Sequence, residues 1–102
     1  GAGGTAPPRR AAMYGKRVAI IERGAEWDDA GVRQGAGYGG TCVNVGCVPK
    51  KLMFTAAAYL EGAEEAAGYG VEHAAPPSLN WPELVQRRNA YVERLNGIYE
   101  RN

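Results

Sequence analysis

The sequence lacks the features that mark secreted, membrane-spanning or nucleic-acid-binding chains. Its 102 residues include two cysteines, whereas a secreted disulfide scaffold of this size usually carries four or more. Twelve basic and eleven acidic residues leave a formal net charge of +1, so nothing indicates a nucleic-acid partner. No apolar run approaches the roughly 20 residues of a membrane span. Two cysteines in such a chain fit redox use in a reducing compartment.

The two ends of the sequence suggest part of a longer protein. The chain opens on Gly1, with neither Met nor a charged-then-apolar signal segment, and it ends at Asn102 directly after a helical pattern. With 45% hydrophobic residues, it suits a single unit whose small core gives marginal stability. We expect a cytoplasmic location, with mitochondrion and plastid as the alternatives.

The first 40 residues predict an α/β arrangement. A glycine cluster at 1–4 precedes a helical segment at 9–14 that Gly15 ends, and a short apolar run at 17–22 (RVAIIE) ends in an acid. Such a run is typical of a buried parallel strand. Glycine loop, helix, strand and terminal carboxylate together form part of a Rossmann-type dinucleotide-binding unit. The first strand and the remaining domains would lie outside the chain.

Gly1, Gly3, Gly4 and Glu22 are the candidate nucleotide ligands. A glycine-rich turn lets backbone N–H groups approach a pyrophosphate at a helix N-terminus, and a carboxylate at a strand end accepts hydrogen bonds from ribose hydroxyls. Glycine clusters are common, so the alternative is that Glu22 is an ordinary acid at the end of a strand.

Two helices are expected in the second half of the chain. The composition predicts the first over 41–67, with Gly68 as its C-terminal stop. The second, over 81–102, begins with Asn80 as its capping residue, and Pro82 and Glu83 suit its first turn. Its apolar residues recur along one face. They are Leu84, Val85, Tyr91, Val92, Leu95, Ile98 and Tyr99.

Cys42 and Cys47 lie near the start of the first of these helices. In a regular helix their Cα atoms would be roughly 8.6 Å apart, and a disulfide needs less than about 7 Å. A bridge therefore requires a distorted turn, which Gly46 and Pro49 permit, and it would be comparatively reducible. A helix N-terminus and Lys50 would stabilise a thiolate. Spacing alone also allows two inert buried cysteines, whereas one histidine and no further cysteine make a poor zinc site.

Residues 39–51 read GGTCVNVGCVPKK. This segment resembles the active-site segment of the flavoprotein disulfide reductases, which include glutathione, trypanothione and thioredoxin reductases. The resemblance implies tightly bound FAD, with NADPH as the electron donor. It implies that Cys42 attacks the disulfide substrate, that Cys47 faces the flavin as a charge-transfer thiolate, and that Lys50 lies near the reactive flavin nitrogen. Gly40 and Thr41 would contact the cofactor.

Residues 1–8 match the family less closely. Either Gly1 is the second glycine of the family fingerprint, or GAGGTA is a complete G-x-G-x-x-A motif. Ala2 stands where the family usually has Ser, close to flavin and substrate. Pro7 and Pro8 fall inside the expected helix, where an interior proline costs about 3 kcal/mol.

The helix over 81–102 is similar to the one that lines the disulfide-substrate cleft of glutathione reductases. The resemblance puts Ile98, Tyr99 and Asn102 on substrate-facing positions, although periodicity alone favours packing of the helix face for Ile98 and Tyr99. Arg9 matches an arginine that pairs with a glycine carboxylate of glutathione. Trypanothione reductases have Trp in place of Arg9 and Glu in place of Ala6. The implied substrate is glutathione disulfide, an anion that suits a cationic cleft.

The implied activity is the reduction of glutathione disulfide by NADPH, within cell redox homeostasis. In this family a His oriented by a Glu, both from the partner subunit of a homodimer, protonates the departing thiol. Residues 1–102 would then be a partial FAD-binding domain that is inactive alone. The alternatives are a trypanothione or thioredoxin reductase, or an inactive truncated FAD-binding fragment.

Overall fold

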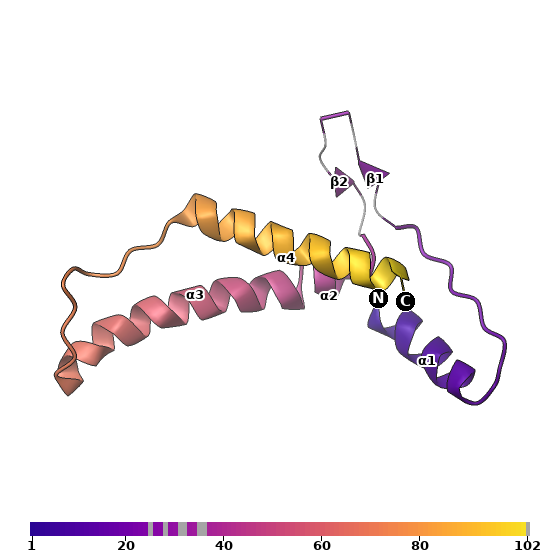
Figure 1. The fold of residues 1–102 in the computed structure, drawn as a ribbon, viewed down its shortest axis with the longest axis horizontal. Helices are drawn as coiled ribbons and strands as arrows, with labels where there is room; N and C mark the ends of the chain where they lie inside the picture. Colours follow the sequence, from indigo (N-terminus) through magenta and orange to yellow (C-terminus); the bar gives the residue numbers. More distant parts are fainter. Residues whose placement is uncertain (25, 28, 31–32, 35–36, 102) are drawn as a thin grey trace.

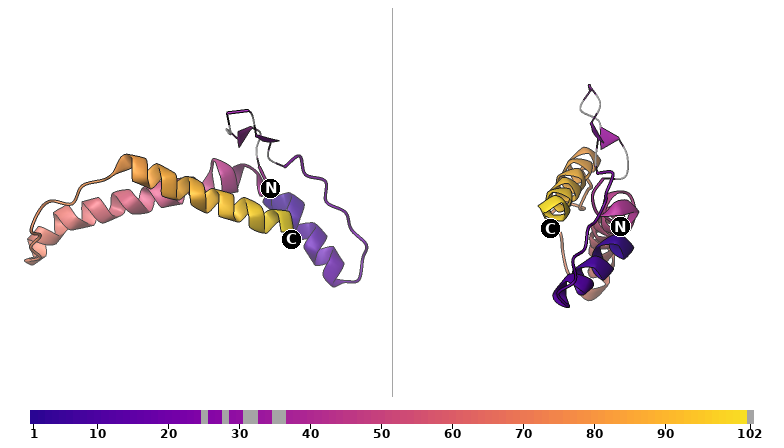
Figure 2. Two further views of the ribbon diagram at one scale, coloured as in Figure 1. Left: turned by 45° about the horizontal axis from the view of Figure 1, so that its top comes forward. Right: turned by 90° about the vertical axis from the view of Figure 1, so that its right-hand side faces the viewer.

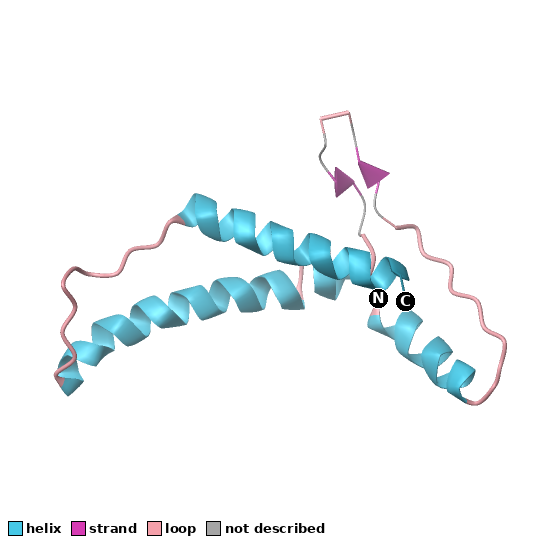
Figure 3. Cartoon of the chain, viewed as in Figure 1, coloured by secondary structure: helices cyan, strands magenta, loops and turns pink. Residues whose placement is uncertain are grey.

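The chain folds mainly into helices (Figures 1 and 3). The computed structural model describes residues 1–24, 26–27, 29–30, 33–34 and 37–101. Its α-helices are α1 (Ala2–Met13), α2 (Gly40–Asn44), α3 (Cys47–Ala66) and α4 (Trp81–Arg101), and a 3-10 turn, η1 (Ala67–Tyr69), follows α3. Two short strands, β1 (Glu26–Trp27) and β2 (Arg33–Gln34), pair antiparallel, with Glu26 opposite Gln34.

The helices are spread along a long, thin molecule. α3 and α4 lie side by side and run in opposite directions, and α1 lies at the other end (Figures 1 and 2). The extents are 60 × 39 × 16 Å and the radius of gyration is 19.1 Å, compared with about 13 Å for a compact domain of this length. The accessible surface is 8053 Å², whereas a compact chain of this mass exposes about 5,600 Å². The described residues therefore bury little surface among themselves.

The small core lies where α2 meets α4. Val43 of α2 and Val92 of α4 are 5% and 3% exposed, and two amide side chains, Asn44 and Asn96, are buried beside them. Among the described residues, no large side chain is fully buried. Buried amide and apolar side chains therefore share the contact between α2 and α4.

The α/β fold predicted from the sequence is wrong. Within the described ranges there is no parallel sheet, and the strand pairing there is the antiparallel β1–β2 ladder. The predicted strand at 17–22 lies outside any sheet, and its Val18, Ile20 and Ile21 are 46%, 49% and 98% exposed. A buried parallel strand needs hydrogen-bonded neighbours, and the described residues supply none to this segment. A short apolar run has the composition of a strand but does not provide its partner.

The glycine cluster predicted as a loop is instead the first turn of α1. The helix begins at Ala2, seven residues earlier than the predicted segment at 9–14, and Gly3 and Gly4 lie within it. Pro7 and Pro8 also lie inside α1, where they lack the amide protons that would bond to the Gly3 and Gly4 carbonyls. The helix ends at Met13. The predicted stop at Gly15 is confirmed by its φ of +72°.

The ends of the two long helices follow local signals. The Oδ1 of Asn80 accepts a hydrogen bond from the Glu83 N–H at 3.1 Å, which confirms the predicted cap of α4. The helix predicted over 41–67 is divided into α2 and α3. Gly68 is not its stop, because Gly68 lies inside η1 and the residue with a left-handed φ of +78° is Gly70. None of the described helices combines the length and apolar character that crossing a membrane requires.

Candidate active site

Cys42 and Cys47 form a disulfide, with their Cα atoms 4.6 Å apart. A regular helix would hold these atoms at roughly 8.6 Å, so the distortion predicted from the spacing is confirmed. It lies between α2 and α3, where Val45 has φ −136° and ψ 5° and Gly46 has φ −121° and ψ −111°. The chain leaves the helical conformation for two residues, which brings the start of α3 back beside α2.

Gly46 allows this close return of the chain. A Cβ at this position would lie 3.0 Å from the carbonyl oxygen of Thr41, and that oxygen is held because it accepts the Val45 N–H at 2.9 Å. α3 then begins with the Gly46 carbonyl accepting the Lys50 N–H at 3.0 Å. Pro49 lies in the first turn of α3, where the missing amide proton breaks no helical hydrogen bond.

The disulfide lies at the positive end of α3. Cys47 is the first residue of this 20-residue helix, whose unpaired N–H groups favour a thiolate there. Lys50 and Lys51 follow within the next turn, and the Lys51 ammonium lies 5.6 Å from the centre of the Phe54 ring. Cys42, Cys47 and both lysines are exposed. Within the described residues, the pair is therefore open to solvent.

Gly39 and Gly40 join α2, the disulfide helix that carries Cys42, to the rest of the site. Their φ angles are +85° and +74°, in the region that favours glycine. A Cβ on Gly39 would lie 2.6 Å from Cγ2 of Val43 and 3.2 Å from Cδ2 of Tyr99, and a Cβ on Gly40 would lie 2.7 Å from Cα of Gly1. The two glycines thus let α1, α2 and α4 converge.

A cavity of about 520 Å³ opens beside this convergence. Its volume lies within the ~300–1,000 Å³ of small-molecule sites. The predicted site residues that line it are Gly1, Gly4, Arg9, Glu22, Ile98 and Tyr99. The other lining residues are Thr5, Ala6, Ile20, Ile21, Tyr38, Gly39 and Leu95. The fold therefore brings the predicted nucleotide and substrate residues from three segments into one cavity.

The Cys42–Cys47 pair lies next to this cavity and not in its wall. Cys42, Cys47 and Lys50 are absent from the lining, as are Gly3, Gly40 and Thr41. Gly40 adjoins the cavity through its close approach to Gly1. Asn102 and the side chain of Ala2 lie outside the part of the molecule that the structure describes.

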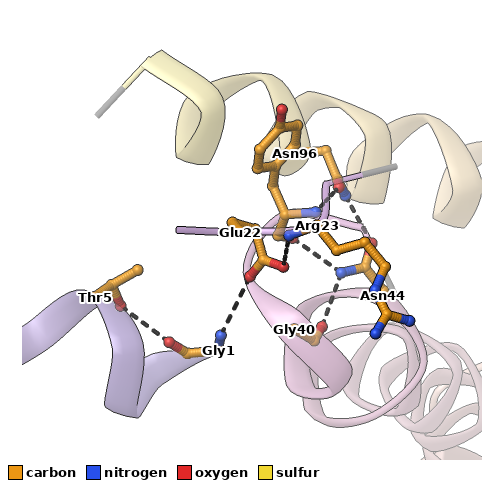
Figure 4. A network of polar contacts seen from close by, with 8 residues as sticks. Gly1, Thr5, Glu22, Arg23, Gly40, Asn44 and Asn96 are labelled. Atoms are coloured by element: carbon orange, nitrogen blue, oxygen red, sulfur yellow. Dashed lines mark hydrogen bonds and ion pairs between the residues drawn. The ribbon is translucent and has the colours of Figure 1, made fainter. Parts of the chain in front are cut away.

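The cavity has features that a nucleotide cofactor needs. The N-terminus of the 12-residue α1 lies at its wall through Gly1 and Gly4, and such an end attracts phosphate. Glu22 offers a carboxylate. Its Oε1 accepts the Arg23 N–H at 2.7 Å and its Oε2 lies 3.8 Å from the Gly1 nitrogen (Figure 4). These residues fit a group that carries phosphates and hydroxyls. In the described part of the chain, no group of three or more His, Cys, Asp or Glu residues is arranged to hold a metal ion.

Sequence reasoning missed Tyr38, Asn44 and Asn96. Tyr38 lines the cavity, and the two asparagines, 7% and 5% exposed, bond to each other and to the Tyr38 backbone (Figure 4). A signal for Asn96 was present, because an amide interrupts the apolar face between Val92 and Tyr99. A buried amide on such a face needs a hydrogen-bond partner.

The chain has close relatives among known proteins, although no family model matches it. It is 44% identical to the glutathione reductase of Yarrowia lipolytica over 105 residues and 42% identical to that of Schizosaccharomyces pombe over 102 residues. It is also 42% identical to the glutathione reductase of Burkholderia cepacia over 101 residues. These matches cover 99–100% of the chain but about 20% of each relative. The chain therefore belongs to the glutathione reductase family, and it spans about one fifth of the length of the curated relatives that it matches.

Proposed function

We propose that the whole protein containing this chain reduces glutathione disulfide with NADPH, through FAD and the Cys42–Cys47 pair. The single observation that carries the proposal is the broken helix, which joins the two cysteines at the positive end of α3, beside a cavity that contains Arg9. Family membership supports the same reaction. Because the pair must cycle between disulfide and dithiol, we assign the activity to a reducing compartment, the cytoplasm.

The residues around the point where α1, α2 and α4 meet at Gly39 and Gly40 would hold FAD. Gly1, Gly4 and the N-terminus of α1 suit its pyrophosphate, and Glu22 suits a ribose. The family resemblance adds Ala2, Gly3, Gly40, Thr41, Cys42 and Lys50 to the cofactor contacts. Bound FAD would supply the electrons, taken from NADPH, that open the disulfide. We assign no NADPH site to these residues.

Cys42 and Cys47 would divide the reaction between them. Reduction of their bond takes two electrons and two protons and leaves two thiols. The Cys42 thiolate attacks one sulfur of glutathione disulfide, and one glutathione leaves as a thiolate that takes up a proton. The Cys47 thiolate then attacks the Cys42 sulfur of the mixed disulfide, which releases the second glutathione and re-forms the original bond. The positive end of α3 and the nearby charge of Lys50 would favour the Cys47 thiolate.

The proton for the first departing glutathione would come from a partner subunit. We propose a homodimer in which a His oriented by a Glu of the partner subunit protonates that thiolate, as the family resemblance implies. The described residues offer no equivalent pair, because His73 is an exposed residue outside the cavity lining. The 102 residues alone should therefore show no turnover.

The preference for an anionic disulfide is assigned to Arg9, and Ile98, Tyr99 and Asn102 are the other substrate contacts that the family resemblance implies. Arg9 and Ala6 both line the cavity, so the double change Arg9→Trp with Ala6→Glu reverses the local charge. In the whole protein it should lower kcat/KM for glutathione disulfide by about 10–100-fold and raise that for a cationic disulfide. Arg10→Trp is the matched control, because Arg10 contacts the Tyr14 ring and does not line the cavity. An unchanged preference in the double variant would refute the substrate assignment.

The reaction itself is tested by the visible spectrum of the whole protein, titrated with NADPH and then with glutathione disulfide. We expect a bound-flavin spectrum that gains a long-wavelength charge-transfer band on reduction and loses it when glutathione disulfide is added. Bound flavin without such a band would mean that Cys42–Cys47 does not accept the electrons, and the mechanism would be wrong.

A further inference from the structure

Two buried amides link the disulfide helix to α4 (Figure 4). The Nδ2 of Asn96 donates to Oδ1 of Asn44 at 2.8 Å and to the Val92 carbonyl at 3.0 Å. The Oδ1 of Asn96 accepts the Tyr38 N–H at 2.7 Å. The Nδ2 of Asn44 donates to the carbonyls of Tyr38 and Gly40 at 2.9 Å and 2.8 Å. The pair thereby holds the loop before α2, the first turn of α2 and α4 together.

α2 is too short to be stable on its own. It contains five residues, far fewer than an isolated helix needs to be stable in water. Its buried apolar side chain is Val43. The Cys42–Cys47 bond ties it to α3, but that bond opens in every cycle of the proposed function. With the bond open, the amide pair and Val43 still hold α2 on α4.

We propose that Asn44 and Asn96 are positioning residues, which keep the Cys42 sulfur close to Cys47 while the disulfide is open. The inference rests on the proposed function for the statement that this bond cycles. The positioning itself concerns the thiol–disulfide equilibrium of the pair. While α2 stays on α4, the two thiols keep a high effective concentration toward each other, which favours closure of the bond.

Loss of the amide pair affects the two redox forms unequally. In the oxidised form the covalent bond keeps α2 beside α3, so α2 cannot move to relieve its unpaired polar groups. In the dithiol form α2 can move away and regain hydrogen bonds to water. Substitution of either asparagine therefore favours the dithiol, and the disulfide becomes easier to reduce.

The test uses the whole protein with Asn44→Leu, Asn96→Leu or both. The protein is equilibrated with mixtures of reduced and oxidised dithiothreitol. Two electrons and two protons pass from the dithiothreitol dithiol to the Cys42–Cys47 bond, which yields two thiols and cyclic dithiothreitol disulfide. Alkylation and mass spectrometry measure the reduced fraction. Each single change should shift the equilibrium about tenfold toward the dithiol, equivalent to about 30 mV. The double change should shift the equilibrium by less than the sum of the two single changes, because the two residues share one bond.

Asn89→Leu is the matched control. Asn89 is an exposed amide on the same helix, and its Oδ1 accepts a hydrogen bond from the Arg88 side chain. It should leave the equilibrium unchanged. A purely structural role for Asn44 and Asn96 would lower the melting temperature of both redox forms and leave their equilibrium where it was. That result, or an equal shift in the Asn89 variant, would overturn the proposal.

A measurement on the wild-type protein covers the case in which a variant fails to fold. Hydrogen exchange of the Tyr38 amide reports whether its bond to Asn96 persists. Its rate should differ by less than about threefold between the oxidised and dithiol forms, and an increase above about tenfold on reduction would refute the positioning role. Turnover of the wild-type protein with NADPH and glutathione disulfide separately decides the proposed function. Neither the exchange rate of the Tyr38 amide nor the turnover rate requires a measurement of the thiol–disulfide equilibrium.

Discussion

Replacing Gly39 with alanine should open the junction between the preceding loop and α2. Its φ of +85° costs an L-residue about 1–2 kcal/mol. The new Cβ would lie 2.6 Å from Cγ2 of Val43, whereas two carbon atoms in good contact lie about 3.5–4.0 Å apart. Val43 belongs to the small core, and overpacking of this kind costs about 1–3 kcal/mol. The expected destabilisation of the junction is therefore about 2–5 kcal/mol.

Amide hydrogen exchange over residues 40–47 of the whole protein measures this loss locally. A loss of about 2 kcal/mol makes exchange through local opening about 30-fold faster. Gly62→Ala is the matched control, because Gly62 lies inside α3 and a Cβ there meets nothing within 4 Å. That change should stabilise its helix by about 0.5–1 kcal/mol. An exchange rate in Gly39→Ala that stays within about threefold of wild type would refute the steric argument.

Three further outcomes follow from the same geometry. Gly46→Ala should lower the fraction of Cys42–Cys47 disulfide at a given redox potential, because its Cβ would lie 3.0 Å from the Thr41 carbonyl; an unchanged fraction after alkylation and mass spectrometry would contradict the turn geometry. Asn80→Ala should destabilise the start of α4 by about 1 kcal/mol, since it removes the acceptor of the Glu83 N–H. Hydrogen exchange there should be about fivefold faster, and Asn80→Ser should retain the wild-type rate. The isolated chain should unfold without a cooperative heat-absorption peak, because its surface of 8053 Å² is about 2,500 Å² above that of a compact chain. A calorimetric transition with an unfolding enthalpy near the ~60–80 kcal/mol of a compact 100-residue domain would contradict this expectation.

The parts of the structure that the sequence predicts correctly depend on local signals. The cap of α4 joins Asn80 and Glu83, three residues apart. The break between α2 and α3 follows from two cysteines five residues apart, because a regular helix separates them too far for a bond and Gly46 relieves that constraint. In both cases the interacting atoms lie within two turns of chain, so residue type and spacing are sufficient.

The predicted strand failed because its formation depends on residues elsewhere. An apolar run such as 17–22 has the same composition whether or not a neighbouring strand exists. The Asn44–Asn96 bond was missed for a related reason, since it joins residues 52 positions apart. An amide on an apolar helix face shows that a partner is needed, but no local pattern identifies that partner.

One face of α4 serves both the core and the cavity. Val92 packs in the core and Asn96 bonds to Asn44, while Leu95 and Tyr99 line the cavity. Residues three or four positions apart lie on the same helix face, one turn of about 5.4 Å from the next. A shift of α4 would therefore displace the cavity wall and the support of the disulfide helix together. A change at Asn96 should move the thiol–disulfide equilibrium, whereas a change at Ile98, which is two residues from Asn96 and lies on another face of α4, should act on the cavity wall.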